Sequence, residues 1–148
     1  IVLVVLIIII GILFTFVFGI TKVDGESMLP SYKNGQTVWF LRVASDFKNG
    51  DVVAVHLPSG KELIKRVIGV PGDEIDIRDG KVYLNGVELE EDYIQGQTFP
   101  SDNEIVDVTY PVVLGENQYF VMGDNREHSL DSRYYGITYV TQIKGRIF

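Results

Sequence analysis

The first 20 residues of this 148-residue chain form an almost unbroken apolar run. Only Gly11, Thr15 and Gly19 interrupt it, and the first charged residue is Lys22. An α-helix rises about 1.5 Å per residue, so roughly 20 residues cross the ~30 Å hydrocarbon core of a bilayer. The run therefore predicts one N-terminal transmembrane helix, over residues 1–21, that anchors the chain in a membrane.

Two alternatives compete with an anchor. A cleavable signal sequence has an apolar region of only about 7–15 residues followed by a small-x-small site. Here the apolar run is longer and leads into Gly-Ile-Thr-Lys at 19–22. A helix packed in a soluble core keeps a polar face, whereas Ile and Val surround this helix on all sides. Both comparisons favour the anchor.

The remaining 128 residues carry all 33 charged side chains and enough apolar ones for one soluble domain. The net charge of −7 argues against a nucleic-acid partner, because such proteins normally present a basic patch. The lack of cysteine excludes a thiolate zinc site, a disulfide framework and a cysteine nucleophile. With only two histidines, a multi-histidine metal site is not expected either.

Short runs rich in Val, Ile, Tyr and Phe follow the apolar segment. Pairs ending in glycine, which favour hairpin turns, separate them at 34–35, 49–50, 59–60, 79–80 and 85–86. The runs predict strands over 36–43, 51–57, 62–70, 74–77, 81–84, 118–122 and 138–147. We therefore expect a mostly β domain over residues 22–148, with coiled or barrel-like sheets. The acidic segment at about 88–113 is expected to form a small extension over this core.

One serine directly after the apolar run stands in a constrained context. Ser27 lies between Gly25 and Pro30, which favour a turn that exposes its hydroxyl. As a single feature, such a serine is more often a turn residue or a helix cap than a nucleophile. A nucleophilic serine also needs a base, and neither histidine has a recognisable triad context.

A lysine can be that base only as a neutral amine, and its usual pKa of about 10.4 then requires burial among apolar groups. Lys65 lies in an apolar run over residues 63–70, where alternate side chains share one face of a strand. Lys65 and Arg66 therefore point to opposite faces, and one of the two cations must meet the more apolar side. The alternative is an edge strand whose inward charge prevents unwanted pairing.

A dense polar run, residues 123–133, follows the apolar strand predicted at 118–122. Its sequence is Gly-Asp-Asn-Arg-Glu-His-Ser-Leu-Asp-Ser-Arg. So many hydrogen-bonding side chains exceed what a plain hairpin needs. Either the run is a solvated loop, or Asp/Arg pairs hold it as a structured loop beside a site.

Together, these three stretches resemble the type I signal peptidase family of membrane-anchored serine proteases, in the family's own order. The matching residues are 25–30, 50–55, 64–73 and 123–136. The most specific parts are Lys-Arg-Val-Ile-Gly-x-Pro-Gly-Asp at 65–73 and the Gly-Asp-Asn-Arg box that begins at residue 123. The resemblance implies an endopeptidase that removes N-terminal signal peptides from secreted preproteins and needs no metal or organic cofactor.

The resemblance also implies residue roles. Ser27 would attack the scissile carbonyl, and neutral Lys65 would act as the general base and then protonate the leaving amine. Ser129 matches the family serine that orients the lysine amine through a hydrogen bond. Asp131 and Arg133 match the paired charges that hold the box in shape.

Two positions, Gly25 and Lys65, separate branches of the family, and a third, Ser31, is a mild departure from its usual pattern. Gly25 stands where one branch has a serine whose hydroxyl contributes to the oxyanion hole, so backbone donors such as the Ser27 amide would bind the oxyanion here. This glycine is similar to that of the Gram-positive branch. Ser31 replaces the usual threonine and keeps the hydroxyl. Lys65 stands where the endoplasmic reticulum enzymes have histidine, which implies a bacterial origin.

The substrates implied by the resemblance have small residues, typically alanine, at positions −1 and −3 from the cut. A shallow apolar pocket would receive them, and we place four residues around it: Val23, Met28, Leu63 and Ile64. Trp39 and Phe40, which lie near the anchor in sequence, are expected either in the lipid interface or in the core.

These features predict a single-pass membrane protein whose catalytic domain lies on the extracytoplasmic side, with preprotein signal peptides and the lipid bilayer as partners. A self-cleaving Ser/Lys protease of the repressor type has a related β core but acts in the cytoplasm without a spanning helix, so residues 1–20 count against it. A membrane-tethered binding module, or an inactive homologue, would not need Ser27, Lys65 and Ser129 together.

Overall fold

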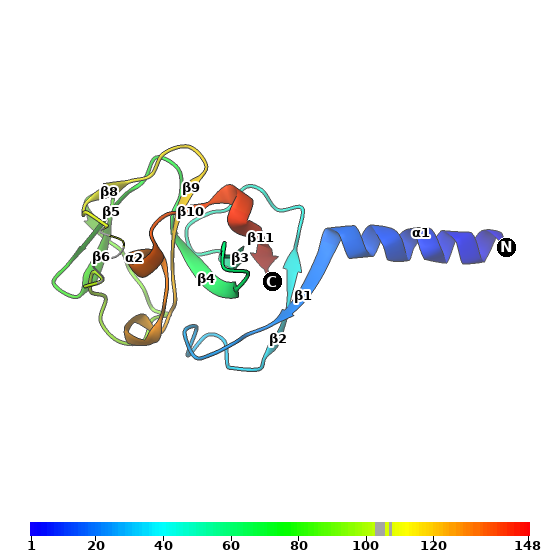
Figure 1. The fold of residues 1–148 in the computed structure, drawn as a ribbon, viewed down its shortest axis with the longest axis horizontal. Helices are drawn as coiled ribbons and strands as arrows, with labels where there is room; N and C mark the ends of the chain where they lie inside the picture. Colours follow the sequence, from blue (N-terminus) through cyan, green and yellow to red (C-terminus); the bar gives the residue numbers. More distant parts are fainter. Residues whose placement is uncertain (103–105, 107) are drawn as a thin grey trace.

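The computed structural model describes residues 1–102, 106 and 108–148. It begins with helix α1 (Val2–Val17), which projects away from a β-rich body (Figure 1). No residue of α1 is buried. Because nearly all its side chains are apolar, the helix presents an apolar surface to its surroundings.

The apolar run does not form the continuous helix predicted over residues 1–21. α1 ends at Val17, and the next five residues form strand β1 (Phe18–Lys22), which pairs antiparallel with β2 (Thr37–Leu41). Packing fits this change, because Gly19 pairs with Phe40 and leaves room for its ring, which a Cβ at Gly19 would meet at 2.2 Å. Within the described residues, no helix is long and apolar enough to cross a membrane. The predicted transmembrane helix is therefore not supported.

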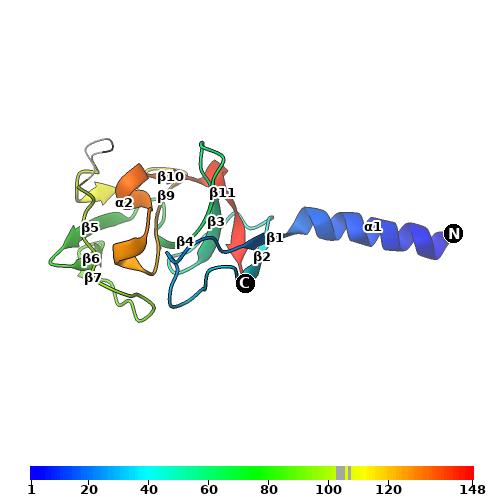
Figure 2. The ribbon, with the colours of Figure 1, turned by 60° about the horizontal axis from the view of Figure 1, so that its bottom comes forward.

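Seven strands form one large antiparallel sheet in the order β1-β2-β11-β3-β4-β9-β10. Figures 1 and 2 show that this sheet curls rather than lying flat. The prediction of a mostly β, coiled or barrel-like domain is thus confirmed. The strands after β2 are β3 (Val52–His56), β4 (Glu62–Gly69), β9 (Gln118–Met122), β10 (Thr138–Tyr139) and β11 (Ile143–Ile147).

A second sheet of four short strands lies at the end of the body away from α1 (Figure 1). Its order is β7-β6-β5-β8, and all its pairs are antiparallel. The strands are β5 (Glu74–Arg78), β6 (Lys81–Leu84), β7 (Val87–Glu88) and β8 (Val112–Val113). Strands β7 and β8 bracket the predicted extension at 88–113, of which residues 103–105 and 107 lie outside the described part of the chain.

The sequence predicted one strand over 138–147, but the structure divides it. Helix η2 (Val140–Gln142) is a 3₁₀ turn that separates β10 from β11. Two other short helices, η1 (Arg126–His128) and α2 (Ser132–Tyr135), follow β9. The chain thus turns back on itself after β9, which packs the polar run 123–133 against the large sheet.

The core lies on both faces of the large sheet and between the two sheets. On one face, Met28 and Phe40 pack with Val52 and Ile64, and on the other Val53 and Val67 pack with aromatic side chains. A third cluster joins β5 and β6 to β9. Because both faces of β3 are covered, four of its five residues are buried. A polar side chain in the middle of β4, such as Lys65, is therefore enclosed.

Candidate active site

Ser27 lies in the connection between β1 and β2, which backbone and side-chain hydrogen bonds close into a compact turn. The N–H of Val23 donates to the carbonyl of Gln36 at 2.8 Å, and the N–H of Gly25 donates to Asn34 Oδ1 at 3.0 Å. Met28, the next residue after Ser27, is fully buried in the core. The turn is thus fixed on both sides of the serine.

Lys65 comes from the middle of β4 and reaches the same place. Its Nζ lies 2.6 Å from Ser27 Oγ, within hydrogen-bond distance, although 38 residues separate the two. Only 2% of the Lys65 surface is exposed. The two sides of the strand differ as alternation predicts: Lys65 faces the serine, and Arg66 faces Asp124.

Burial lowers the pKa of Lys65 from 10.5 to about 8, because the charged ammonium loses its water. The negative charge of Asp131 acts in the opposite direction and raises this pKa, while the positive charge of Lys61 lowers it. An amine with this pKa is neutral in about one tenth of molecules at pH 7 and in about half at pH 8. A serine hydroxyl next to such an amine is the arrangement that nucleophilic catalysis requires.

The polar run after β9 packs directly against Ser27. A Cβ at Gly123 would lie 2.2 Å from Ser129 Oγ and 2.4 Å from the Ser27 carbonyl, so this position has no room for a side chain. Ser129 is buried, and within the described residues its Oγ has no hydrogen-bond partner. The hydrogen bond from Ser129 to Lys65 that the family resemblance implies is thus absent from the described contacts, although the serine lies beside the site.

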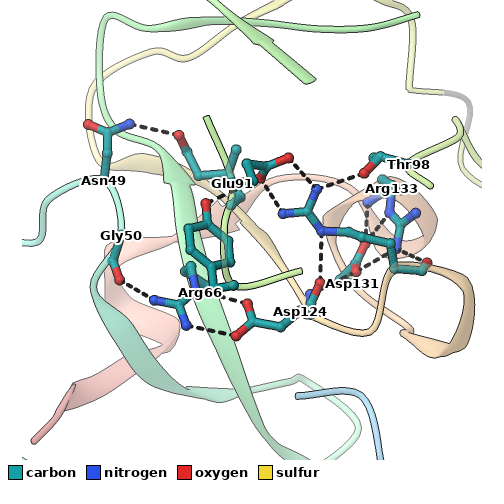
Figure 3. Close-up of polar contacts among 12 residues, drawn as sticks. Asn49, Gly50, Arg66, Glu91, Thr98, Asp124, Asp131 and Arg133 are labelled. Carbon is teal, nitrogen blue, oxygen red and sulfur yellow. Dashed lines mark hydrogen bonds and ion pairs between the residues drawn. The ribbon is translucent and has the colours of Figure 1, made fainter. Parts of the chain in front are cut away.

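Asp131 and Arg133 form a buried ion pair that shapes this run (Figure 3). Arg133 donates through Nε to Asp131 Oδ1 at 2.9 Å, and a second guanidinium nitrogen donates to the Arg126 carbonyl at 2.8 Å. Asp131 Oδ2 also accepts the backbone N–H of Gly123 at 3.0 Å. The pair therefore connects the two ends of the run through charge-assisted hydrogen bonds.

A second ion pair, between Arg66 and Asp124, was not singled out by sequence reasoning (Figure 3). Arg66 donates two hydrogen bonds to the Asp124 carboxylate, at 2.8 and 2.7 Å, and Ser31 donates a third at 2.6 Å. The ring of Tyr93 covers the Arg66 guanidinium at 4.1 Å. The sequence signal was the second cation of the Lys65-Arg66 pair, which had to find a partner on the other face of β4.

A small cavity of about 190 Å³ opens beside Ser27 and Lys65. Of the four residues predicted around the substrate pocket, only Leu63 lines this cavity. Val23, Met28 and Ile64 pack together in a core cluster instead. Residues that were not predicted complete the lining: Asp24, Gly25, Glu26, Lys61, His128 and Leu130. In residues 1–102, 106 and 108–148, no group of three or more acidic or histidine side chains could hold a metal ion.

Comparison with known proteins agrees with this geometry. Residues 1–148 match the family described as "Signal peptidase, peptidase S26". Signal peptidase I P of Bacillus subtilis subsp. natto is 35% identical over 126 residues, which cover 80% of this chain and 68% of that protein. Signal peptidase IB of Staphylococcus aureus is 32% identical over 139 residues, which cover 84% of this chain and 73% of that protein.

A solved structure gives the same result. The crystal structure of a signal peptidase I from Enterococcus faecalis is 33% identical, covers 70% of this chain and 97% of that one, and superposes with a TM-score of 0.58. The resemblance found in the three sequence stretches is thereby confirmed. The chain belongs to the signal peptidase family, peptidase S26, and is a serine endopeptidase.

Proposed function

We propose that this endopeptidase removes N-terminal signal peptides from secreted preproteins at the outer surface of the cell membrane. In this proposal Ser27 is the nucleophile and Lys65 is the general base. The observation that carries this proposal is the 2.6 Å separation of Ser27 Oγ and a buried Lys65 amine. No other base is needed, because a neutral amine at that distance can take the hydroxyl proton directly.

The proposed reaction has two halves. In the first, Lys65 Nζ takes the proton from Ser27, whose Oγ bonds to the scissile carbonyl carbon. As the peptide C–N bond breaks, the lysine ammonium returns the proton to the leaving amine, and the signal peptide stays bound to Ser27 as an ester. In the second half, Lys65 takes a proton from water, whose oxygen attacks the ester carbonyl. As the bond from this carbon to Ser27 Oγ breaks, the lysine ammonium returns the proton to Oγ, and the signal peptide leaves with a new carboxyl terminus.

The oxyanion is assigned to the backbone N–H of Ser27. The neighbouring Gly25 N–H is already engaged, since it donates to Asn34 Oδ1 at 3.0 Å. Ser129 is assigned to orient the Lys65 amine when substrate is bound. Its support is that the hydroxyl is buried beside the site and has no competing partner in the described part of the chain.

The proposed substrates are preproteins with small residues next to the cut. The cavity of about 190 Å³ beside the dyad is where the side chain at −1 would lie, and the match to the signal peptidase family supports small residues at positions −1 and −3 from the cut. Leu63 and Leu130 supply apolar lining next to the Ser27 hydroxyl. We retain Leu63 among the proposed substrate contacts and add Leu130.

Membrane contact is proposed through the apolar surface of α1 and an aromatic patch at its base. This patch consists of Phe14, Phe18, Trp39 and Phe148, which line a purely apolar hollow of about 310 Å³. Trp39 is 43% exposed, whereas its neighbour Phe40 is buried in the core. Exposed aromatic side chains of this kind favour the interface between lipid and water. Ser27 follows β1 by only five residues, so a patch in lipid would keep the nucleophile near the membrane surface.

The test is cleavage of purified preproteins in detergent or lipid, with sequencing of the new N-terminus. A preprotein with alanine at −1 and −3 is expected to be cut at that bond. A matched preprotein with phenylalanine at −1 should be cut about 100-fold more slowly or not at all, because we propose a shallow pocket for the side chain at this position. Equal cleavage of both preproteins would contradict the proposed substrate class.

A further inference from the structure

The segment 88–98 of the extension carries one acidic side chain that is almost fully enclosed. Only 5% of the Glu91 side chain is exposed, and its carboxylate forms a bidentate ion pair with the fully buried Arg126 side chain. Arg126 Nη1 donates to Glu91 Oε2 at 2.9 Å, and Arg126 Nη2 donates to Glu91 Oε1. Figure 3 shows Glu91 beside the Asp131–Arg133 pair, on the same polar cluster.

Arg126 also donates hydrogen bonds to the polar run itself and to the extension. Its Nε donates to the Gly123 carbonyl at 2.9 Å, and its Nη1 also donates to Thr98 Oγ1 at 2.7 Å. The backbones are joined as well, since the N–H of Gln95 donates to the Asp124 carbonyl at 2.8 Å and the N–H of Arg126 donates to the Gln95 carbonyl at 2.9 Å. The extension therefore contacts residues 123–126 on the side that faces away from Ser27.

The opposite side of residues 123–126 touches the nucleophile's turn. The N–H of Asn125 donates to the Ser27 carbonyl at 3.0 Å, and Asn125 Nδ2 donates to the Glu26 carbonyl at 3.2 Å. At Gly123 the backbone lies so close to the Ser27 carbonyl that a Cβ would meet it at 2.4 Å. A displacement of residues 123–126 would therefore displace Ser27.

We propose that Glu91 is a positioning residue for the nucleophile, acting through Arg126 to hold residues 123–126 against the backbone of Ser27. The inference rests on the proposed role of Ser27 and gives the extension a function in catalysis. Its physical basis is that Arg126, enclosed and charged, needs a carboxylate partner to keep its orientation. Without Glu91 the guanidinium has to turn toward water, and its hydrogen bond to Gly123 is lost with it.

A purely structural role for Glu91 predicts something different, namely a loss of stability without a change in the active site. Two control variants separate these roles. Glu90→Gln makes the same charge change at the adjacent exposed position, and Val82→Ala destabilises the small sheet without touching residues 123–126. Neither residue contacts the cavity or Ser27.

The experiment measures kcat, KM, thermal unfolding and backbone amide exchange for the full chain and its variants, all assayed well below the unfolding temperature. Glu91→Gln is expected to lower kcat by about 10- to 100-fold, the effect of a displacement of about 1 Å. KM should stay within about twofold, because the substrate cavity is intact. The Asn125 amide should exchange about tenfold faster or more, while the Val67 amide in β4 keeps its protection. Both control variants should keep the kcat and the Asn125 exchange of the parent.

If Glu91→Gln fails to fold, the double variant Glu91→Leu/Arg126→Met carries the test, because it removes both charges and leaves no unpaired guanidinium. The same fall in kcat is expected. Full kcat in a folded Glu91 variant, or a fall no larger than that of an equally destabilised Val82→Ala chain, would overturn the proposal. A parent chain that cuts no preprotein contradicts the proposed function alone, and the exchange of Asn125 then still decides whether Glu91 holds the loop on Ser27.

Discussion

At the residue scale, the proposed chemistry depends on how one lysine is kept partly neutral. Enclosure of Lys65 in β4 removes water from its ammonium, and this lowers its pKa to about 8. Asp131 opposes the change and Lys61 reinforces it, so the final value reflects a balance of charges around the site. The same enclosure brings the amine within 2.6 Å of Ser27 Oγ. Burial thus supplies both the proton affinity and the geometry of the proposed base.

The first prediction concerns pH. Below pH 8 most Lys65 amines are protonated and cannot accept a proton, so kcat/KM should rise about tenfold per pH unit up to a plateau above about pH 8. Lys61→Met removes a positive charge that lowers the pKa of Lys65, so its midpoint should move to higher pH. Lys48→Met, an equal change at an exposed site away from the cavity, should leave the midpoint in place. A midpoint unmoved by Lys61→Met would contradict this electrostatic coupling.

The second prediction concerns stability. The pKa of Lys65 is lower in the folded chain than in the unfolded one, so the unfolded chain binds more protons between about pH 8 and 10.5 and the free energy of unfolding rises with pH across this window. Below it, the buried amine costs about 3 kcal/mol. Lys65→Met should therefore be more stable than the parent by up to about 3 kcal/mol at pH 7, and by less at pH 10. Urea unfolding at both pH values measures this. A difference that does not depend on pH would contradict the lowered pKa.

At the element scale, strand pairing joins residues that are far apart in sequence. Strand β4 presents Lys65 to the turn after β1 and Arg66 to the box after β9. The Arg66–Asp124 pair is enclosed, with the Asp124 side chain fully buried. The pair joins the start of the box to β4, directly after Gly123.

The third prediction tests this pair. Asp124→Ala leaves Arg66 without its carboxylate in a largely buried setting and should lower the free energy of unfolding by about 3–5 kcal/mol. Glu62→Ala removes the partner of Lys144 in an exposed pair at 2.9 Å, and should cost at most about 1 kcal/mol. Urea unfolding of both variants compares them directly. Equal losses would show that the Arg66–Asp124 pair contributes no more than a surface ion pair.

Sequence reasoning predicted the strands around the site well, because turn pairs and apolar alternation define β3, β4, β6 and β9 locally. It placed Ser27 and Lys65 together only through the family resemblance, since 38 residues separate them. It missed β1, because an apolar run of Ile, Val and Phe fits a helix and a strand equally, and the close approach of Gly19 to Phe40 depends on tertiary packing. The Glu91–Arg126 pair could not be predicted either, because this contact also depends on tertiary packing.

The predicted substrate pocket shows a further limit. Val23, Met28 and Ile64 are apolar and near the dyad in sequence, which made them reasonable lining residues. Alternation along β4, however, turns Ile64 away from Lys65 and into the core with the other two. Only Leu63, on the same side of the strand as Lys65, reaches the cavity.

At the scale of the whole molecule, apolar surface is concentrated at one end. α1 and the patch of Phe14, Phe18, Trp39 and Phe148 lie together there, while the small sheet and the extension lie at the other end (Figure 1). Ser27 follows β1, the strand that continues directly from α1. An orientation with this end in lipid would bring the dyad to the membrane surface.

The fourth prediction uses Trp39, the chain's one tryptophan, as a reporter. Its fluorescence should shift to shorter wavelength when the full chain meets phospholipid vesicles, because the indole leaves water. Phe148→Ser removes one ring of the patch and should weaken vesicle binding by about 10- to 100-fold. Phe99→Ser, at an exposed phenylalanine of the extension, is the matched control and should bind as the parent does. Equal weakening by the two variants would contradict contact through the patch.

The most direct measurement of the central claim compares preprotein cleavage by the parent, Ser27→Ala and Lys65→Met, each shown to be folded by circular dichroism. If Ser27 is the nucleophile and Lys65 its base, the parent cuts after the small residue at −1 and each variant loses cleavage by about 10⁴-fold or more. Lys65→Met should lose activity while keeping or gaining stability, which excludes unfolding as the cause. Cleavage by Lys65→Met at the rate of the parent would contradict the assignment of the base, and cleavage by Ser27→Ala would contradict that of the nucleophile.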